Sequence, residues 1–175
     1  MENWVKYHKE NRIGYLTLNR PEKRNALNGN FVNQLQQQLE LCKKDTDLRV
    51  LVLKGEGEAF CAGADLAYLQ ELQNNTYAEN LSDSENLKQL FYTLYNFPKP
   101  VIAQVEGHAI AGGSGLATVC DFVFSVPEAK FGYTEVRIGF VPAIVSVFLL
   151  KKVGENKAKD LLLTGRLIDA SEALS

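Results

Sequence analysis

Apolar and polar residues repeat with two different periods along the chain, and the change of period separates predicted strands from predicted helices. Residues 4–18 hold two β-rich runs around residues 11–12, which predicts a hairpin. In residues 29–44 the apolar positions recur every three or four residues, as on one face of a helix. Asn28 precedes this segment, and its side chain suits the N-cap. The chain therefore opens as two strands followed by one helix.

Three continuous apolar runs predict buried strands. The first is RVLVLKG at 49–55, which ends in glycine and is typical of a strand covered on both faces. The other two are PVIAQVEG at 100–107 and DFVFSV at 121–126, on either side of a glycine-rich segment. Runs of this length without alternation fit a parallel sheet better than an open antiparallel one.

The remaining segments predict helices and one long loop. Residues 73–86 are polar and predict a mobile loop that leads into a helix over 87–97. Two more helices are expected near 142–163, and the apolar run at 140–150 predicts that the first of them is buried. Strands that alternate with helices indicate an α/β fold with largely parallel strands. No linker or repeat divides the chain, so residues 1–175 are expected to form one domain.

Composition and charge narrow the possible functions. The apolar fraction of 46% and the charged fraction of 23% are those of an ordinary globular domain. A net charge of −2 argues against a nucleic-acid partner. Two histidines and three cysteines without metal-ligand spacing argue against a metal site, and the odd cysteine count predicts reduced thiols in a cytoplasmic compartment. No apolar run reaches the roughly 18–20 residues of a membrane span, so no membrane partner is expected.

Two loops of small residues follow two of the predicted strands. They are CAGAD at 61–65 and AIAGGSG at 109–115. Ligands of α/β folds gather at the carboxyl ends of parallel strands, and the first amides of a following helix have no intrahelical partner. Two such amides aimed at one point would stabilise an oxyanion. Close packing is the alternative explanation for these glycines, and neither loop fits a dinucleotide, phosphate-loop or nucleophile-elbow motif.

Four segments together carry a family resemblance. They are NRPEKRNALN (19–28), AFCAGADL (59–66), PKPVIAQVEGHAIAGGSGLATVCDFVFS (98–125) and AKFGYTEVRIGFVP (129–142). In order and spacing they resemble the crotonases, the family of enoyl-CoA hydratases and isomerases. The resemblance implies a spiral of ββα units that binds an acyl-CoA thioester. Within the family the chain is most similar to single-glutamate hydratases, such as the bacterial methylglutaconyl-CoA hydratases of leucine breakdown.

The same resemblance implies a catalytic centre. The oxyanion hole would be formed by the backbone N–H groups of Ala62 and Gly112, and Glu135 would be the catalytic carboxylate. The two-base hydratases of the family carry a second glutamate, and Gly115 stands at that position here. One carboxylate can still carry both proton transfers of a hydration. A surface glutamate paired with Arg137 is the alternative for Glu135, and Arg137 is also a candidate for binding a distal carboxylate of the substrate.

Contacts to coenzyme A are implied for a further group of residues: Lys23, Arg24, Ala26, Ala62, Ala64, Asp65 and Leu66. The two basic side chains suit the phosphates of the coenzyme, although a solvated turn explains them equally well. Asp65 has a second possible role as the N-cap of the following helix.

The expected function is that of an enoyl-CoA hydratase, a lyase, with an isomerase using the same glutamate or a non-catalytic acyl-CoA-binding homologue as alternatives. Coenzyme A enters as part of the substrate, so no separate cofactor and no metal are expected. Family members act in fatty-acid and branched-chain amino-acid breakdown and assemble as homotrimers or hexamers. They also continue past the point where this chain ends, so the last helices of the fold are expected to be absent.

Overall fold

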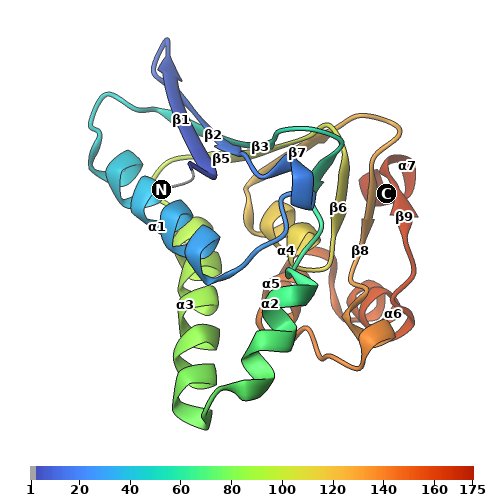
Figure 1. The fold of residues 1–175 in the computed structure, drawn as a ribbon. Helices are drawn as coiled ribbons and strands as arrows, with labels where there is room; N and C mark the ends of the chain where they lie inside the picture. The colour runs from blue at the N-terminus through green and yellow to red at the C-terminus, as the bar shows by residue number, and fades with distance from the viewer. Residues whose placement is uncertain (1–2) are drawn as a thin grey trace.

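The fold is taken from a computed structural model that describes residues 3–175, and its strands form two sheets (Figure 1). The first sheet has the order β1-β2-β3-β5-β7, with β1 Val5–Glu10, β2 Ile13–Leu18, β3 Val50–Gly55, β5 Val101–Val105 and β7 Phe122–Ser125. The second has the order β4-β6-β8-β9, with β4 Ala59–Cys61, β6 His108–Ile110, β8 Lys130–Gly132 and β9 Ile168–Asp169.

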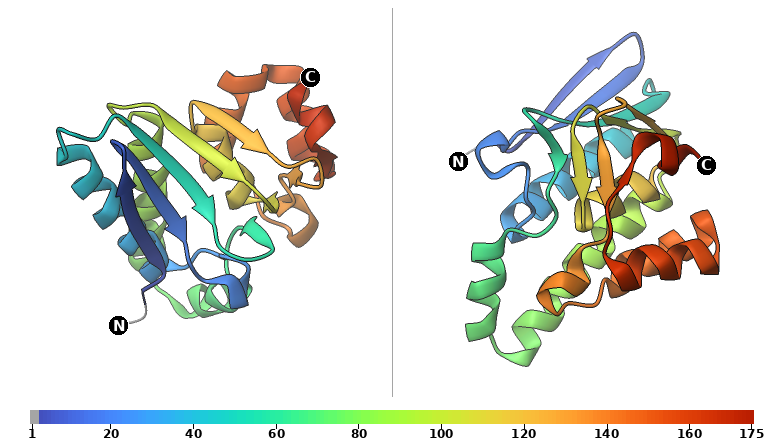
Figure 2. Two further views of the ribbon diagram at one scale, coloured as in Figure 1. Left: turned by 90° about the horizontal axis from the view of Figure 1, so that it is seen from above. Right: turned by 90° about the vertical axis from the view of Figure 1, so that its right-hand side faces the viewer.

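The chain alternates between the two sheets in a repeating unit. Each of β3, β5 and β7 lies in the first sheet and is followed by a short strand of the second sheet, β4, β6 and β8. A helix follows each pair, and all pairings between these strands of one sheet are parallel. The strands of the second sheet lie side by side in the right-hand view of Figure 2. This arrangement confirms the predicted α/β spiral of ββα units.

Seven α-helices and three short 3-10 turns complete the described residues. They are α1 Gly29–Lys44, α2 Leu66–Glu71, α3 Tyr77–Tyr95, α4 Gly112–Val119, α5 Ala143–Val153, α6 Glu155–Thr164 and α7 Ala170–Leu174, with short 3-10 turns η1 Pro21–Lys23, η2 Leu72–Asn74 and η3 Glu135–Ile138. Helices α1 and α3 pack against each other, and α4 lies at the centre of the fold (Figure 1). None of the helices in residues 3–175 has the length and hydropathy to cross a bilayer.

The predicted N-terminal elements are confirmed. The hairpin turns at Asn11 and Arg12, which both have positive φ, and α1 begins after Asn28, whose side chain accepts the Phe31 amide. Strand β3 is buried at Leu51 and Leu53 on one face and at Val52 on the other, as a doubly covered strand should be.

Three expectations for the later elements are wrong. The segment 73–86 is not a loop, because α3 already begins at Tyr77 behind a capping box formed by Thr76 and Glu79. Strand β7 is a strand but lies at the sheet edge, where all four of its residues are exposed. The two helices expected near 142–163 are present as α5 and α6, but the first of them is not buried throughout, because just two side chains of α5, Val145 and Leu149, are buried.

Candidate active site

The two small-residue loops meet in the structure. Strands β4 and β6 are parallel neighbours, so the loops that follow them leave the sheet at the same edge. A Cβ at Gly63 would lie 2.8 Å from the Ala111 Cβ and 3.2 Å from the Gly112 nitrogen. Gly63 also has φ +85°, which favours glycine. The two loops therefore converge as expected, and they touch at residues 63 and 112.

The backbone pairing of the first loop decides which of its amides is free. Leu27 forms an isolated parallel bridge with Ala64: its amide donates to the Gly63 carbonyl at 2.7 Å, and its carbonyl accepts from the Asp65 amide at 2.8 Å. In such a ladder the amide of the bridged residue points to the opposite side. The N–H of Ala64 accordingly has no acceptor among the described residues.

The expectation for Ala62 is corrected by the same pairing. Its N–H donates to the Arg24 carbonyl at 3.0 Å, so it is already used within the fold. Gly112 is different, because it is the first residue of α4 and its N–H has no acceptor in residues 3–175. The two open amides of this edge are therefore those of Ala64 and Gly112.

The glycines of α4 serve different purposes. A Cβ at Gly113 would lie 2.0 Å from the Cys61 carbonyl oxygen, so this residue allows α4 to pack directly on β4. A Cβ at Gly112 would find nothing closer than 3.7 Å, so a side chain would have room at this position. Ser114 is structural, because its Oγ donates to the Ala109 carbonyl at 2.6 Å and accepts from the Gly132 amide at 2.9 Å.

Glu135 follows the next strand of the same sheet. Strand β8 pairs with β6, and the Gly132 carbonyl at its end accepts the Ala111 amide at 2.7 Å, which ties this segment to the start of α4. The side chain of Glu135 is half-buried, and its Oε2 is shielded from solvent without a hydrogen-bond partner in the described structure. This desolvation raises the pKa of Glu135 above the usual value of a glutamate.

No ion pair joins Glu135 to Arg137 in residues 3–175. The Arg137 side chain instead lies beside Gly165, where α6 ends, because a Cβ at Gly165 would be 3.4 Å from the Arg137 Cγ. A carboxyl that has a raised pKa and no ion-pair partner is suited to taking up and returning a proton.

The residues expected to contact coenzyme A differ in their exposure and in whether their side chains are already engaged within the fold. Lys23 and Arg24 are exposed, and neither side chain forms an ion pair with another described residue. Leu66 is 63% exposed at the start of α2, whereas Ala26 is buried. The side chain of Asp65 is already engaged, because it caps α2 through the Ala67 amide and pairs with Arg20 at 2.8 Å.

Two supporting residues escaped the sequence analysis. Arg20 is buried and reaches both Asp65 and the Ala26 carbonyl, at 2.8 and 3.0 Å. Asn25 is fully buried, and its side-chain amide donates to the Ala59 carbonyl at 2.8 Å. Arg20 and Asn25 hold residues 20–27 against the first loop, and nothing in an isolated NRPEKRNALN segment shows that its polar side chains face inward.

Comparison with known proteins places this geometry in context. The family model described as enoyl-CoA hydratase/isomerase matches residues 8–175. A Thermus thermophilus protein whose name assigns it to the enoyl-CoA hydratases is 50% identical over 92% of this chain and 64% of its own length. The 2,3-dehydroadipyl-CoA hydratase of Escherichia coli is 38% identical over 94% of this chain and 63% of its own length.

Solved structures agree with the sequence comparison. A Legionella pneumophila crystal structure described as an enoyl-CoA hydratase/isomerase (crotonase) superimposes with a TM-score of 0.94 at 39% identity, covering 97% of this chain and 66% of its own. An enoyl-CoA hydratase from Shewanella pealeana gives the same TM-score at 31% identity and is covered over 64% of its length. The chain thus spans less than two thirds of the curated relatives named above.

Proposed function

We propose that this chain, which belongs to the enoyl-CoA hydratase/isomerase family, contributes the catalytic centre of an enoyl-CoA hydratase that adds water across the 2,3 double bond of an acyl-CoA thioester. The observation that carries the proposal is the half-buried carboxyl of Glu135, which has no ion-pair partner among the described residues and follows β8, the strand that pairs with β6 ahead of the open Gly112 amide. The open amides of Ala64 and Gly112 would form the oxyanion hole.

The reaction uses these groups in two proton transfers. Ionised Glu135 takes a proton from water while the oxygen of that water bonds to C3 of the substrate. The electron pair of the double bond moves toward the thioester, and the carbonyl oxygen becomes an enolate oxyanion. The N–H groups of Ala64 and Gly112 stabilise that charge. Protonated Glu135 then returns its proton to C2, which restores the thioester carbonyl and the starting state of the enzyme.

Coenzyme A binding follows from the exposed residues beside the first loop. The unpaired side chains of Lys23 and Arg24 suit the phosphates of the coenzyme. Leu66 offers an apolar contact next to the open amide of Ala64. Ala26 and Ala62 would contribute through the backbone around this site. The coenzyme is part of the substrate, and the proposed chemistry requires no other cofactor and no metal.

An isomerase is the second candidate, because one carboxylate suffices for its two proton transfers as well. The same Glu135 could remove a proton from C2 of a 3-enoyl-CoA, which leaves a conjugated dienolate, and return that proton to C4, so that the double bond moves without addition of water. Position 115 offers no second acid, because Gly115 is packed against Val145. Within the hydratases, the segment TEVRIGFVPA supports a single-glutamate subgroup such as the methylglutaconyl-CoA hydratases. For the full-length protein we propose a homotrimer or hexamer.

Two substrates separate the candidates. A hydratase removes the conjugated ultraviolet absorbance of crotonyl-CoA, whereas an isomerase creates that absorbance from a 3-enoyl-CoA. Glu135→Gln is expected to lower kcat by about 10²–10⁴-fold, the usual contribution of a general acid–base group. Glu128→Gln is the matched control, because Glu128 is exposed. If the wild-type protein binds CoA thioesters and turns over neither substrate, the chain is an acyl-CoA-binding homologue and the catalytic proposal is wrong.

A further inference from the structure

Helix α2 directly follows the loop that carries the open Ala64 amide, and few packing contacts fix its orientation. It begins at Leu66, two residues after the open amide of Ala64. None of the side chains of α2, nor of the η2 turn that follows it, is buried. Burial of apolar side chains normally supplies most of the stability of a short helix in a protein. The orientation of α2 must therefore depend on polar contacts.

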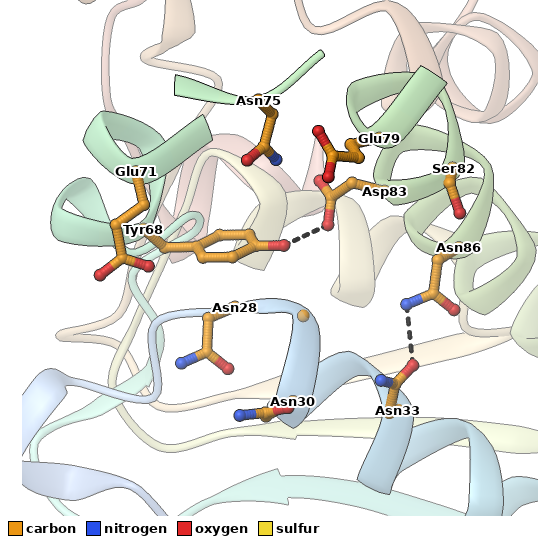
Figure 3. A pocket seen from close by; sticks show the side chains of 11 residues that line it. Asn28, Asn30, Asn33, Tyr68, Glu71, Asn75, Glu79, Ser82, Asp83 and Asn86 are labelled. Carbon is orange, nitrogen blue, oxygen red and sulfur yellow. Dashed lines mark hydrogen bonds between the residues drawn. The ribbon is translucent and has the colours of Figure 1, made fainter. Parts of the chain in front are cut away.

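One of these contacts lies at the start of α2 and one in its middle. At the start, Asp65 is paired with Arg20. In the middle, the Tyr68 hydroxyl donates a hydrogen bond to the Asp83 carboxylate on α3. Figure 3 shows the Tyr68 ring reaching from α2 across to α3, above the first turn of α1. The ring spans a polar groove of about 660 Å³ that contains neither Glu135 nor Gly112.

The start of α1 is shaped around the same hydroxyl. A Cβ at Gly29 would lie only 2.8 Å from the Tyr68 oxygen, and the Gly29 amide interacts with that oxygen. Three elements that are distant in sequence therefore meet at one atom. Burial, Asp83 and its charge raise the pKa of Tyr68 to about 12, so the hydroxyl remains a hydrogen-bond donor throughout the neutral range.

We propose that Tyr68 is a positioning residue for the oxyanion hole. By joining α2 to Asp83 and to the start of α1 at Gly29, it fixes the loop from which the Ala64 amide projects. This inference rests on the proposed function, since the amide needs a fixed direction only if it stabilises an oxyanion. A donor displaced from its direction loses stabilisation of the transition state while leaving the rest of the binding site in place.

Two variants on different elements test the proposal. Tyr68→Phe removes the hydroxyl, and Gly29→Ala displaces it from the other side with a methyl group. Asp83→Asn keeps an oxygen acceptor and is expected to retain the contact. Tyr77→Phe is the matched control, because Tyr77 is 83% exposed at the start of α3.

The full-length enzyme would be measured in three ways: kcat with crotonyl-CoA, affinity for a 3-ketoacyl-CoA read from the absorbance of its bound enolate, and affinity for free CoA, which lacks the carbonyl. We expect Tyr68→Phe and Gly29→Ala to lower kcat and enolate affinity by about tenfold, a part of the full effect of one donor. Free CoA binding should change less than about twofold. Tyr77→Phe and Asp83→Asn should resemble the wild type.

Hydrogen exchange provides a measurement that does not depend on turnover. Peptides covering residues 64–71 should exchange about tenfold faster in Tyr68→Phe and Gly29→Ala than in the wild type, whereas peptides from β3 should not change. Unchanged exchange in residues 64–71, or an equal loss of free CoA affinity, overturns the positioning role. A wild-type enzyme that neither turns over crotonyl-CoA nor binds the enolate contradicts the proposed function. In that case the hydrogen-exchange result alone decides whether Tyr68 anchors α2.

Discussion

Val145 of α5 fills the space where a side chain at Gly115 of α4 would be. A Cβ built at Gly115 would lie 2.3 Å from the Cγ1 of Val145 and 2.9 Å from the Phe91 ring. Helix α5 can approach α4 this closely only because residue 115 has no side chain. The position that corresponds to the second glutamate of two-base hydratases is therefore closed by packing here, and Glu135 is the catalytic carboxylate that we propose.

A pair of glycine substitutions in the same helix tests this packing. Gly115→Ala should lower the free energy of unfolding by about 1–2 kcal/mol, because overpacking outweighs the better helix propensity of alanine. Gly112→Ala is the control for stability, since its Cβ has room, and its urea midpoint should be unchanged or higher. Val145→Ala should cancel most of the Gly115→Ala effect in a double-mutant cycle. Equal effects of the two alanines would contradict the close contact.

The sequence predicts the strongly periodic elements well, and the short strands and the beginning of α3 poorly. Strand β3 and helix α1 have strong periodic patterns that agree with their final environment. Strands β4, β6 and β8 have only three residues each, so their existence depends on pairing with one another rather than on a local pattern. The early start of α3 left a readable signal, because Thr76 and Glu79 have the spacing of a capping box.

We expect the buried ion pair between Arg20 and Asp65 to contribute to the free energy of unfolding. Arg20 and Asp65 have 9% and 10% side-chain exposure, and Arg20 also stacks on Trp4 with 4.8 Å to the ring centroid. Arg20→Met should lower the free energy of unfolding by about 3 kcal/mol at pH 7, because it leaves the Asp65 carboxylate buried without its partner. Glu155→Ala, which removes the exposed pair with Lys159, should leave the urea midpoint within error.

The pH dependence of this pair gives a sharper measurement. Burial by itself raises the pKa of Asp65, but the hydrogen bond and charge of Arg20 hold it below its usual value. In the wild type this contribution to stability is present above the unfolded pKa of about 3.9 and is lost as the pH falls through the folded pKa. Without Arg20 burial dominates, so the Arg20→Met deficit should shrink as the pH falls from 7 toward 4. A deficit that is constant with pH would contradict the assigned partner.

Glu135 should reduce stability at the pH where it is proposed to work. Burial raises its pKa, so the folded protein binds the proton more tightly than the unfolded chain does. The free energy of unfolding contributed by Glu135 is therefore highest below about pH 4.3, the ordinary glutamate pKa, and falls as the pH rises through the folded value. Glu135→Gln should gain stability relative to the wild type between pH 4 and pH 7 in urea titrations. Glu128→Gln, at an exposed glutamate, is the control for replacing a carboxyl by an amide.

The site was predictable in outline but not in its backbone detail. Loops that follow neighbouring parallel strands leave the sheet at the same edge, and residues Gly63 and Gly112 are indeed in contact. Which amide of the first loop is free depends on the register of the Leu27–Ala64 bridge, a contact between segments far apart in sequence. The family resemblance implied Ala62 as the donor, and no local pattern in the sequence encodes the register that leaves the Ala64 amide open instead.

Replacing single backbone amides by esters tests that register directly. An ester at Ala64, with lactic acid in place of alanine, removes one N–H and leaves the side chain unchanged. If this N–H stabilises the enolate, kcat should fall by about 10²–10³-fold. The free energy of unfolding should fall less than in an ester at Ala62, because the Ala64 N–H has no acceptor among residues 3–175 and only the Gly63 carbonyl, now part of an ester, accepts more weakly from Leu27. The ester at Ala62 is the matched control, since it removes the hydrogen bond to Arg24 and should lower stability by about 1 kcal/mol with a smaller effect on kcat. A larger loss of kcat in the Ala62 ester than in the Ala64 ester would identify the Ala62 N–H as the oxyanion donor. Its hydrogen bond to the Arg24 carbonyl would then have to break when the thioester binds.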